Sequence, residues 1–229
     1  MTGQVVSLFG DFFALFAVME WLAFRRHAGA SAVTMVTFWA LLPTAVFSPV
    51  AGALVDRWDA KKTLIASDIG RAALIAVLLW ANSLTAIYAV FVGLGLWSSV
   101  FQPARAVLIK TLVADEELIA ANGMLQQALL LVRIVAMPIG ALLTASLGTR
   151  ACYLADIASF MVSAAAILSI RRVHRPRDKR PGQAALRSEI GEGLRFLLGR
   201  PALCRIIVCL GIALFIATAM TPLLAIYVR

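Results

Sequence analysis

Seven long apolar segments constrain the fold of this chain more than any other feature. They run over residues 3–24, 31–55, 63–81, 84–109, 118–147, 151–170 and 203–228. Each is long enough to cross a hydrocarbon layer of about 30 Å. Lipid offers no partners to open backbone groups, so each segment is predicted to be a helix. The chain is 62% apolar, whereas soluble domains average roughly 45–50%. The sequence therefore predicts an all-α polytopic membrane protein.

One polar segment interrupts this pattern and divides the chain. We predict an N-terminal six-helix bundle over residues 1–171, a basic cytoplasmic loop over 172–202 and a seventh transmembrane helix over 203–229. The net charge of the chain is +9, and ten of its 21 Lys and Arg residues lie from residue 171 to residue 205. Basic residues collect in cytoplasmic loops, and we expect this loop to meet anionic lipid headgroups. No folded basic domain accompanies the charge, so nucleic acid is not an expected partner.

The basic residues also predict how the chain is oriented. The turns after the second and fourth segments contain Arg57, Lys61, Lys62, Arg105 and Lys110. The opposite side has fewer basic residues, although the pair at 25–26 argues the other way. The positive-inside rule thus places the N-terminus in the cytoplasm.

Two short matches recur at the same spacing. Residues 52–54 (Gly-Ala-Leu) return at 140–142, and Asp68-Ile69 returns at Asp156-Ile157, both 88 residues later. A shared offset indicates that segments one to three and four to six are copies of one unit. Because each unit has an odd number of helices, the copies are predicted to be inverted in the membrane, as in secondary transporters.

The stretch from Gly52 to Leu64, GALVDRWDAKKTL, resembles the loop motif between helices two and three of the major facilitator superfamily. Asp59 replaces a glycine of that motif and Ala60 a basic residue. With Asp59, the loop is similar to that of one exporter-like branch of the superfamily, which includes enterobactin exporters and macrolide efflux proteins. Residues 7–11, 67–72, 101–106, 121–126 and 154–160 resemble the same branch.

The resemblance implies a six-helix major-facilitator N-terminal bundle, a 3+3 inverted repeat, plus one further transmembrane helix. It also implies proton-coupled export of a small amphipathic molecule, of the drug or siderophore type, across a bacterial inner membrane. The superfamily has two six-helix halves, so we expect this chain to be a partial transporter needing a missing C-terminal half or a companion chain. The alternative is a truncated membrane protein that does not transport.

Five charged residues are expected to gather near the cytoplasmic end, and we call them the inner-gate cluster. They are Asp56, Arg57, Asp68, Arg71 and Arg105. Charges at membrane depth are costly unless they pair. A pairing that breaks and re-forms would open and close the inner gate. The alternative is a static network that only fixes helix packing.

A second set of polar residues lies deeper. Asp11 is about 12 Å into the first segment at 1.5 Å per residue, and Arg133 lies midway along the fifth. Asn122, Gln126 and Arg133 fall on one helix face. We predict that Asp11 and Arg133 line a central cavity and that Asp11 carries the proton; a buried structural Asp–Arg pair is the alternative. Asp156 mirrors Asp68 in the repeat and is expected to act at the outer end.

No arrangement of residues predicts an enzyme. The sequence lacks a Ser-His-Asp set, metal-ligand spacing and the glycine-rich loop that holds ATP phosphates. Its three cysteines lie in apolar stretches, without a histidine neighbour or metal-ligand spacing. We therefore expect no cofactor, no metal and no catalytic residues, and any transport would draw on an ion gradient.

Overall fold

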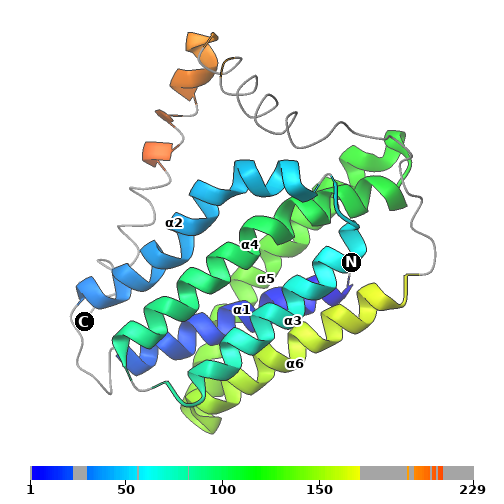
Figure 1. The fold of residues 1–229 in the computed structure, drawn as a ribbon. Coiled ribbons are helices and arrows are strands. Elements are labelled where there is room, and N and C mark those ends of the chain that lie inside the picture. Colours follow the sequence, from blue (N-terminus) through cyan, green and yellow to red (C-terminus); the bar gives the residue numbers. More distant parts are fainter. Residues whose placement is uncertain are drawn as a thin grey trace.

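The computed structural model describes residues 2–22, 30–55, 57–81, 83–170, 195, 199–206, 208–209 and 211–213 (Figure 1). The elements are α1 (Thr2–Glu20), α2 (Ala30–Val55), α3 (Ala60–Leu78), α4 (Leu84–Leu112), a 3-10 turn (Asp115–Glu117), α5 (Leu118–Leu147) and α6 (Thr149–Leu168). The described residues contain no strand. The predicted all-α fold is confirmed, and each of the first six apolar segments forms one helix.

The later part of the chain is described only in pieces. The described residues between Pro201 and Ala213 are helical, and most of the predicted loop over 172–202 and of the seventh helix lies outside the described residues. The division of the chain at residues 171 and 202 therefore stays a prediction.

Local chemistry explains where several helices begin and end. The Asp59 carboxylate accepts a hydrogen bond from the backbone N–H of Lys62 at 3.2 Å. A side-chain oxygen at this position satisfies an otherwise unpaired N–H, so α3 begins at Ala60, three residues before the apolar segment. Ser83 caps α4 in the same way through the N–H of Ala86. Gly148 joins α5 to α6 with φ of +83°, a backbone conformation that favours glycine.

Among the described residues, four helices are long and apolar enough to cross a membrane by length and composition: α2 over Thr34–Val55, α4, α5 and α6. Helix α3 carries Lys61, Lys62, Asp68 and Arg71, and these charged residues lower its hydropathy. Its buried face explains how it is accommodated among apolar helices, because its charged residues Asp68 and Arg71 are enclosed by the neighbouring helices.

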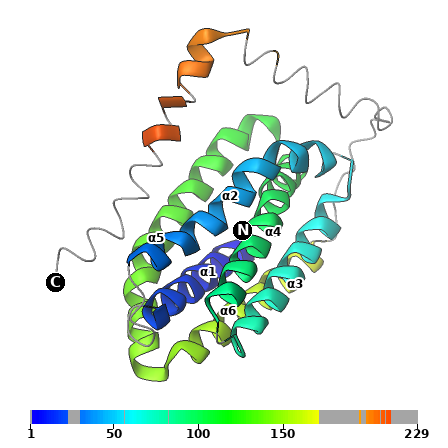
Figure 2. The same cartoon turned by 60° about the vertical axis from the view of Figure 1, so that its left-hand side comes forward.

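The helices pack in an order that differs from their order along the chain. The main contacts join α2 to α4, α4 to α3, α3 to α6, α6 to α1 and α1 to α5 (Figures 1 and 2). Exchanging α1 with α4, α2 with α5 and α3 with α6 turns this series into itself, read backwards. The packing therefore has the two-fold relationship that the 88-residue repeat predicted.

The two helices at the ends of this order, α2 and α5, carry the most exposed apolar residues. On α5 these include Ile119, Met124, Leu131, Ile134 and Leu142. Apolar side chains of this kind can pack against lipid tails or against further helices, because both surroundings are apolar.

Two apolar cores hold the bundle together, one toward each end. The first joins α1, α2, α3, α4 and α6 through residues such as Val18, Ile75 and Phe91. The second lies at the opposite end, where Val55, Leu64 and Leu108 meet. Between them is a layer of buried polar side chains: Ser7, Ser67, Asp68, Arg71, Ser99, Asp156, Ser159 and Ser163. This polar layer is half-way along the helices and contains the candidate site.

Candidate functional site

Arg71, near the middle of α3, is the hub of the polar layer. Its Nη2 donates to Asp68 Oδ1 at 2.5 Å, one turn earlier on the same helix. Its Nη1 lies 3.6 Å from Asp11 Oδ2 on α1. The Arg71 side chain is only 5% exposed, whereas that of Asp11 is 39% exposed. One guanidinium thus connects an enclosed carboxylate with a carboxylate that reaches the face of the bundle.

Two aromatic rings hold this guanidinium in place. Its central carbon is 4.1 Å from the ring centroid of Phe101 on α4 and 4.5 Å from that of Phe160 on α6. A planar guanidinium stacks well on aromatic faces, and the attraction is larger when water is excluded. Arg71 consequently bonds or stacks with side chains from α1, α3, α4 and α6.

Asp156 on α6 belongs to the same layer. Its side chain is fully buried, and Ser159 Oγ lies 3.3 Å from its Oδ1. A Cβ added at Gly10 of α1 would collide with Asp156 Oδ1 and Ser159 Oγ. The glycine therefore lets α1 approach the carboxylate closely, one residue before Asp11. The outer-end role predicted for Asp156 is untested, but its position half-way along α6 places it beside the Arg71 hub.

The structure brings only part of the inner-gate cluster together. Asp68 and Arg71 pair as their i, i+3 spacing predicts. Arg105 instead donates to Gln102 Oε1 on its own helix at 2.6 Å. Arg57 follows the end of α2, and its Nη2 is enclosed without a hydrogen-bond partner. Asp56 lies outside the described residues, so its predicted contacts stay predictions.

Asp11 and Arg133, both predicted to line a central cavity, have different surroundings, and the alternative of an ion pair between them is not what the structure shows. Asp11 meets Arg71, while Arg133 is exposed on α5 with its guanidinium carbon 6.0 Å from the ring of Phe12. Asn122 and Gln126 are also exposed on α5, so the polar stripe exists as a surface feature. Whether it lines a cavity stays a prediction.

Sequence reasoning missed an interaction at the end of the bundle where α3 begins. Lys61 Nζ donates to the backbone oxygens of Leu168 and Ile170, each at 2.8 Å. A cation at a helix C-terminus stabilises the unpaired carbonyls there. The motif contained the signal, a lysine at the start of α3, but the sequence did not show that α6 ends beside it.

The whole chain, residues 1–229, matches the family model of the Major Facilitator Superfamily. The chain belongs to this superfamily. It is 26% identical over 225 residues to the uncharacterized MFS-type transporter YfiS of Bacillus subtilis (strain 168), a match covering 94% of this chain and 52% of YfiS. It is 27% identical over 181 residues to macrolide efflux protein A of Streptococcus pyogenes, covering 74% of this chain and 43% of that protein. The chain spans about half the length of these curated relatives.

Superfamily membership explains the apolar helices as those of a multi-pass membrane protein. The structure also gives a reason for the two departures from the superfamily's loop motif. Asp59 caps α3, a task that a glycine side chain cannot perform. Ala60 is buried with Val55 and Leu64 in the second apolar core, where a basic side chain would be desolvated.

Proposed function

We propose that the chain is the N-terminal six-helix part of a secondary transporter that exports small amphipathic molecules, of the drug or siderophore type, in exchange for protons. The similarity to macrolide efflux protein A supports export as the direction of transport. The chemistry of the helices supports an ion gradient as the energy source, because the chain carries no glycine-rich loop that would hold ATP phosphates. The protein would lie in a bacterial inner membrane with its N-terminus in the cytoplasm.

The observation that carries this proposal is the ion pair between Asp11 and Arg71. Asp11 is half-exposed on the bundle face, and its partner is enclosed among four helices. Protonation of Asp11 would cancel one charge of the pair and weaken the hold of α1 on α3 and α6. A proton taken up at the surface of the bundle would in this way alter the packing of its interior.

The turn after α2 suits the inner-gate function better than the buried Asp68–Arg71 pair does. Asp68 and Arg71 are enclosed, so this pair suits the static, packing role. Arg57 lies in the turn after α2 with a guanidinium nitrogen lacking a hydrogen-bond partner. We assign the opening and closing contacts to Arg57 and Asp56, with Arg105 at a similar depth on α4.

A complete substrate site needs a second wall. The relatives are about twice as long as this chain, and α2 and α5 present broad apolar faces. We propose that a second bundle, in the same chain or in a companion, covers the surface that carries Asp11, Asn122, Gln126 and Arg133. The alternative, a membrane protein that does not transport, predicts no substrate movement whatever is co-expressed.

Transport in membrane vesicles tests the proposal. Inside-out vesicles are prepared with the protein and its completing half. A labelled macrolide is added to the external buffer, and a proton gradient is imposed. Uptake should collapse on adding a protonophore. Asp11→Asn should reduce the gradient-driven uptake at least tenfold, while Glu116→Gln, an exposed carboxylate in the 3-10 turn, should leave it unchanged. Full activity of Asp11→Asn would remove Asp11 from the proton path.

A further inference from the structure

The interface between α3 and α6 contains polar atoms that the Arg71 hub does not satisfy. Asp68 and Ser163 interact with each other across this interface, but Asp156 Oδ2 is enclosed and lacks a hydrogen-bond partner. Asp156 is also fully buried. Buried polar groups are normally hydrogen-bonded, and an unpaired carboxylate oxygen in an apolar surrounding is especially costly. Asp156 Oδ2 therefore calls for a partner that the described side chains do not provide.

The charges in this layer do not balance either. Asp11 from α1, Asp68 from α3 and Asp156 from α6 are grouped around Arg71, and electrostatic interactions link each of them to it. Arg105 from α4 also interacts with Arg71, but its hydrogen bond goes to Gln102. Three carboxylates around one enclosed guanidinium leave an excess of negative charge that one bound proton would reduce.

A proton fits the layer better than a metal ion does. The described residues contain no group of three or more His, Cys, Asp or Glu placed to hold a metal. A proton needs only one oxygen, and it converts that oxygen into a donor. A proton on Asp156 would let its Oδ2 donate a hydrogen bond, which an ionised carboxylate cannot do.

We propose that Asp156 is the proton store of the transporter, an enclosed site beside Ser159 of α6 and Gly10 of α1 that is filled through Asp11. The inference rests on the proposed function and identifies where the coupling proton resides. Asp11 is the open station because it is half-exposed. Asp156 is the closed one, and Gly10, the residue before Asp11, packs against its carboxylate.

The transfer balances in protons and charge. A proton leaves the carboxyl group of Asp11 and forms an O–H bond on Asp156, while Asp11 becomes a carboxylate again and regains its ion pair with Arg71. No electrons are exchanged. Transfer of the proton to Asp156 thus restores the Asp11–Arg71 ion pair, and with it the contact between α1 and α3.

The charged and polar groups that act on Asp156 are Asp11 from α1, Arg71 from α3 and Ser159 from α6. Asp68 and Arg105 act on Arg71. Ser159 Oγ donates to the Asp156 backbone oxygen at 2.7 Å and lies 3.3 Å from Asp156 Oδ1, which makes Ser159 a matched second probe.

Infrared spectroscopy of the full chain in lipid nanodiscs tests the store without requiring transport. A protonated carboxyl gives a C=O stretching band that a carboxylate lacks. We expect one such band from an enclosed group at neutral pH, lost in Asp156→Asn and retained in Asp11→Asn. Ser159→Ala should keep the band but shift its frequency, because the hydroxyl beside Asp156 Oδ1 is removed. Glu116→Gln should change nothing.

The possible results separate the store from the proposed function. A band that survives unchanged in Asp156→Asn, or none at neutral pH in the parent chain, would overturn the store even if vesicles show proton-driven export. A band lost only in Asp156→Asn, with no export in any vesicle preparation, would uphold the store and refute the transport proposal. Should Asp156→Asn fail to fold, the frequency shift in Ser159→Ala decides, and an unshifted band there counts against the store.

Discussion

The carboxylate of Asp68 and the guanidinium of Arg71 form an ion pair that water does not reach. Their contact is 2.5 Å long, and the two side chains are 0% and 5% exposed. Moving two charges out of water costs several kcal/mol for each ion, and only close pairing compensates for it. The stability of the bundle should therefore depend on keeping both partners or replacing both, and much less on which of these is chosen.

Removing Arg71 alone should be the most damaging single change in α3. We expect Arg71→Met to lower the free energy of unfolding by about 3–5 kcal/mol, because Asp68 is left as an unpaired buried charge. The double variant Asp68→Asn with Arg71→Met should be more stable than Arg71→Met. Denaturant unfolding in detergent measures both variants, with Lys110→Met, at an exposed lysine in the last turn of α4, as control. A double variant less stable than Arg71→Met would contradict the argument.

Two glycines should respond to the same substitution with opposite signs. A methyl group at Gly10 collides with Asp156 and Ser159, whereas one at Gly123 meets nothing within 4 Å. Gly10→Ala should destabilise the protein by about 1–3 kcal/mol through overpacking. Gly123→Ala should stabilise α5 by up to about 1 kcal/mol, since alanine is the better helix former. Thermal unfolding distinguishes the two, and equal shifts in one direction would show that α1 does not lie tightly against α6.

Neighbouring lysines should differ in importance. Lys61 binds the last carbonyls of α6, while Lys62 is exposed. Lys61→Met should cost about 1 kcal/mol of stability and speed amide hydrogen exchange over residues 165–170. Lys62→Met should leave exchange there unchanged. If both variants exchange alike, the contact between α3 and the end of α6 is not maintained in the membrane.

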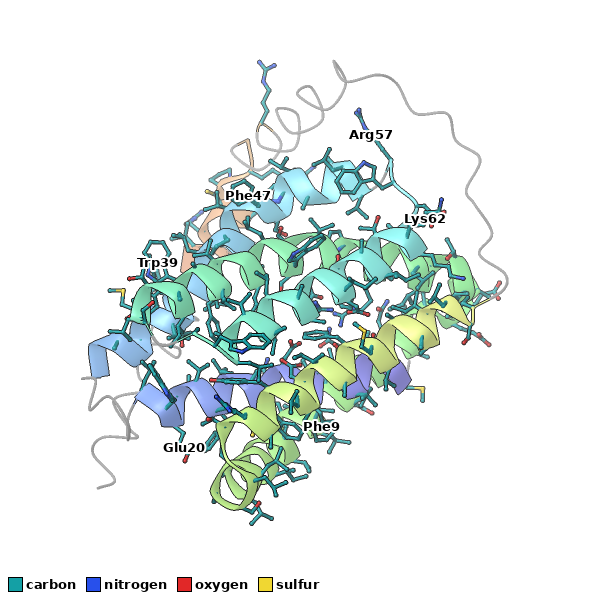
Figure 3. All side chains as sticks on the ribbon, turned by 60° about the horizontal axis from the view of Figure 1, so that its bottom comes forward. Phe9, Glu20, Trp39, Phe47, Arg57 and Lys62 are labelled. Carbon is teal, nitrogen blue, oxygen red and sulfur yellow. The ribbon has the colours of Figure 1, made fainter. Side chains whose placement is uncertain are left out.

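The proposed orientation places two turns on opposite sides of the membrane. Arg57 and Lys62 lie at one end of the bundle and Glu20 at the other (Figure 3). With the native cysteines replaced, Trp58→Cys in the turn before α3 should react with an impermeant maleimide only in inside-out vesicles. Ser83→Cys, before α4, should react only in intact spheroplasts. The reverse result would mean that the N-terminus faces outward.

Sequence alone predicted the helices well because lipid restricts a spanning segment to one backbone form. It predicted Asp68 with Arg71 because spacing along one helix determines which residues share a face. It did not identify Arg71 as the partner of Asp11, and the alternative to the predicted cavity named Arg133 on α5 instead. Hydropathy and spacing do not say that α3 lies between α4 and α6, and it is this position that brings Arg71 within reach of α1.

Distance along the chain also hid the partners of Lys61 and the rings around Arg71. Phe101 and Phe160 read as ordinary apolar residues of spanning segments, and only the fold places their faces 4.1 and 4.5 Å from a guanidinium. The serines near Asp156 had a usable signal, because 156, 159 and 163 recur at helical spacing on one face.

The polar layer between the two apolar cores determines how these helices choose their neighbours. Contacts between apolar side chains discriminate poorly in a bilayer, where lipid tails offer similar surroundings. If apolar contacts alone acted, any of the six apolar helices could take another's place at little cost in free energy. Asp11, Asp68, Arg71 and Asp156 remove that freedom, because a misplaced helix would strand a charge in hydrocarbon. Two of these residues, the proposed proton carriers Asp11 and Asp156, thus also help to specify the assembly order of the bundle.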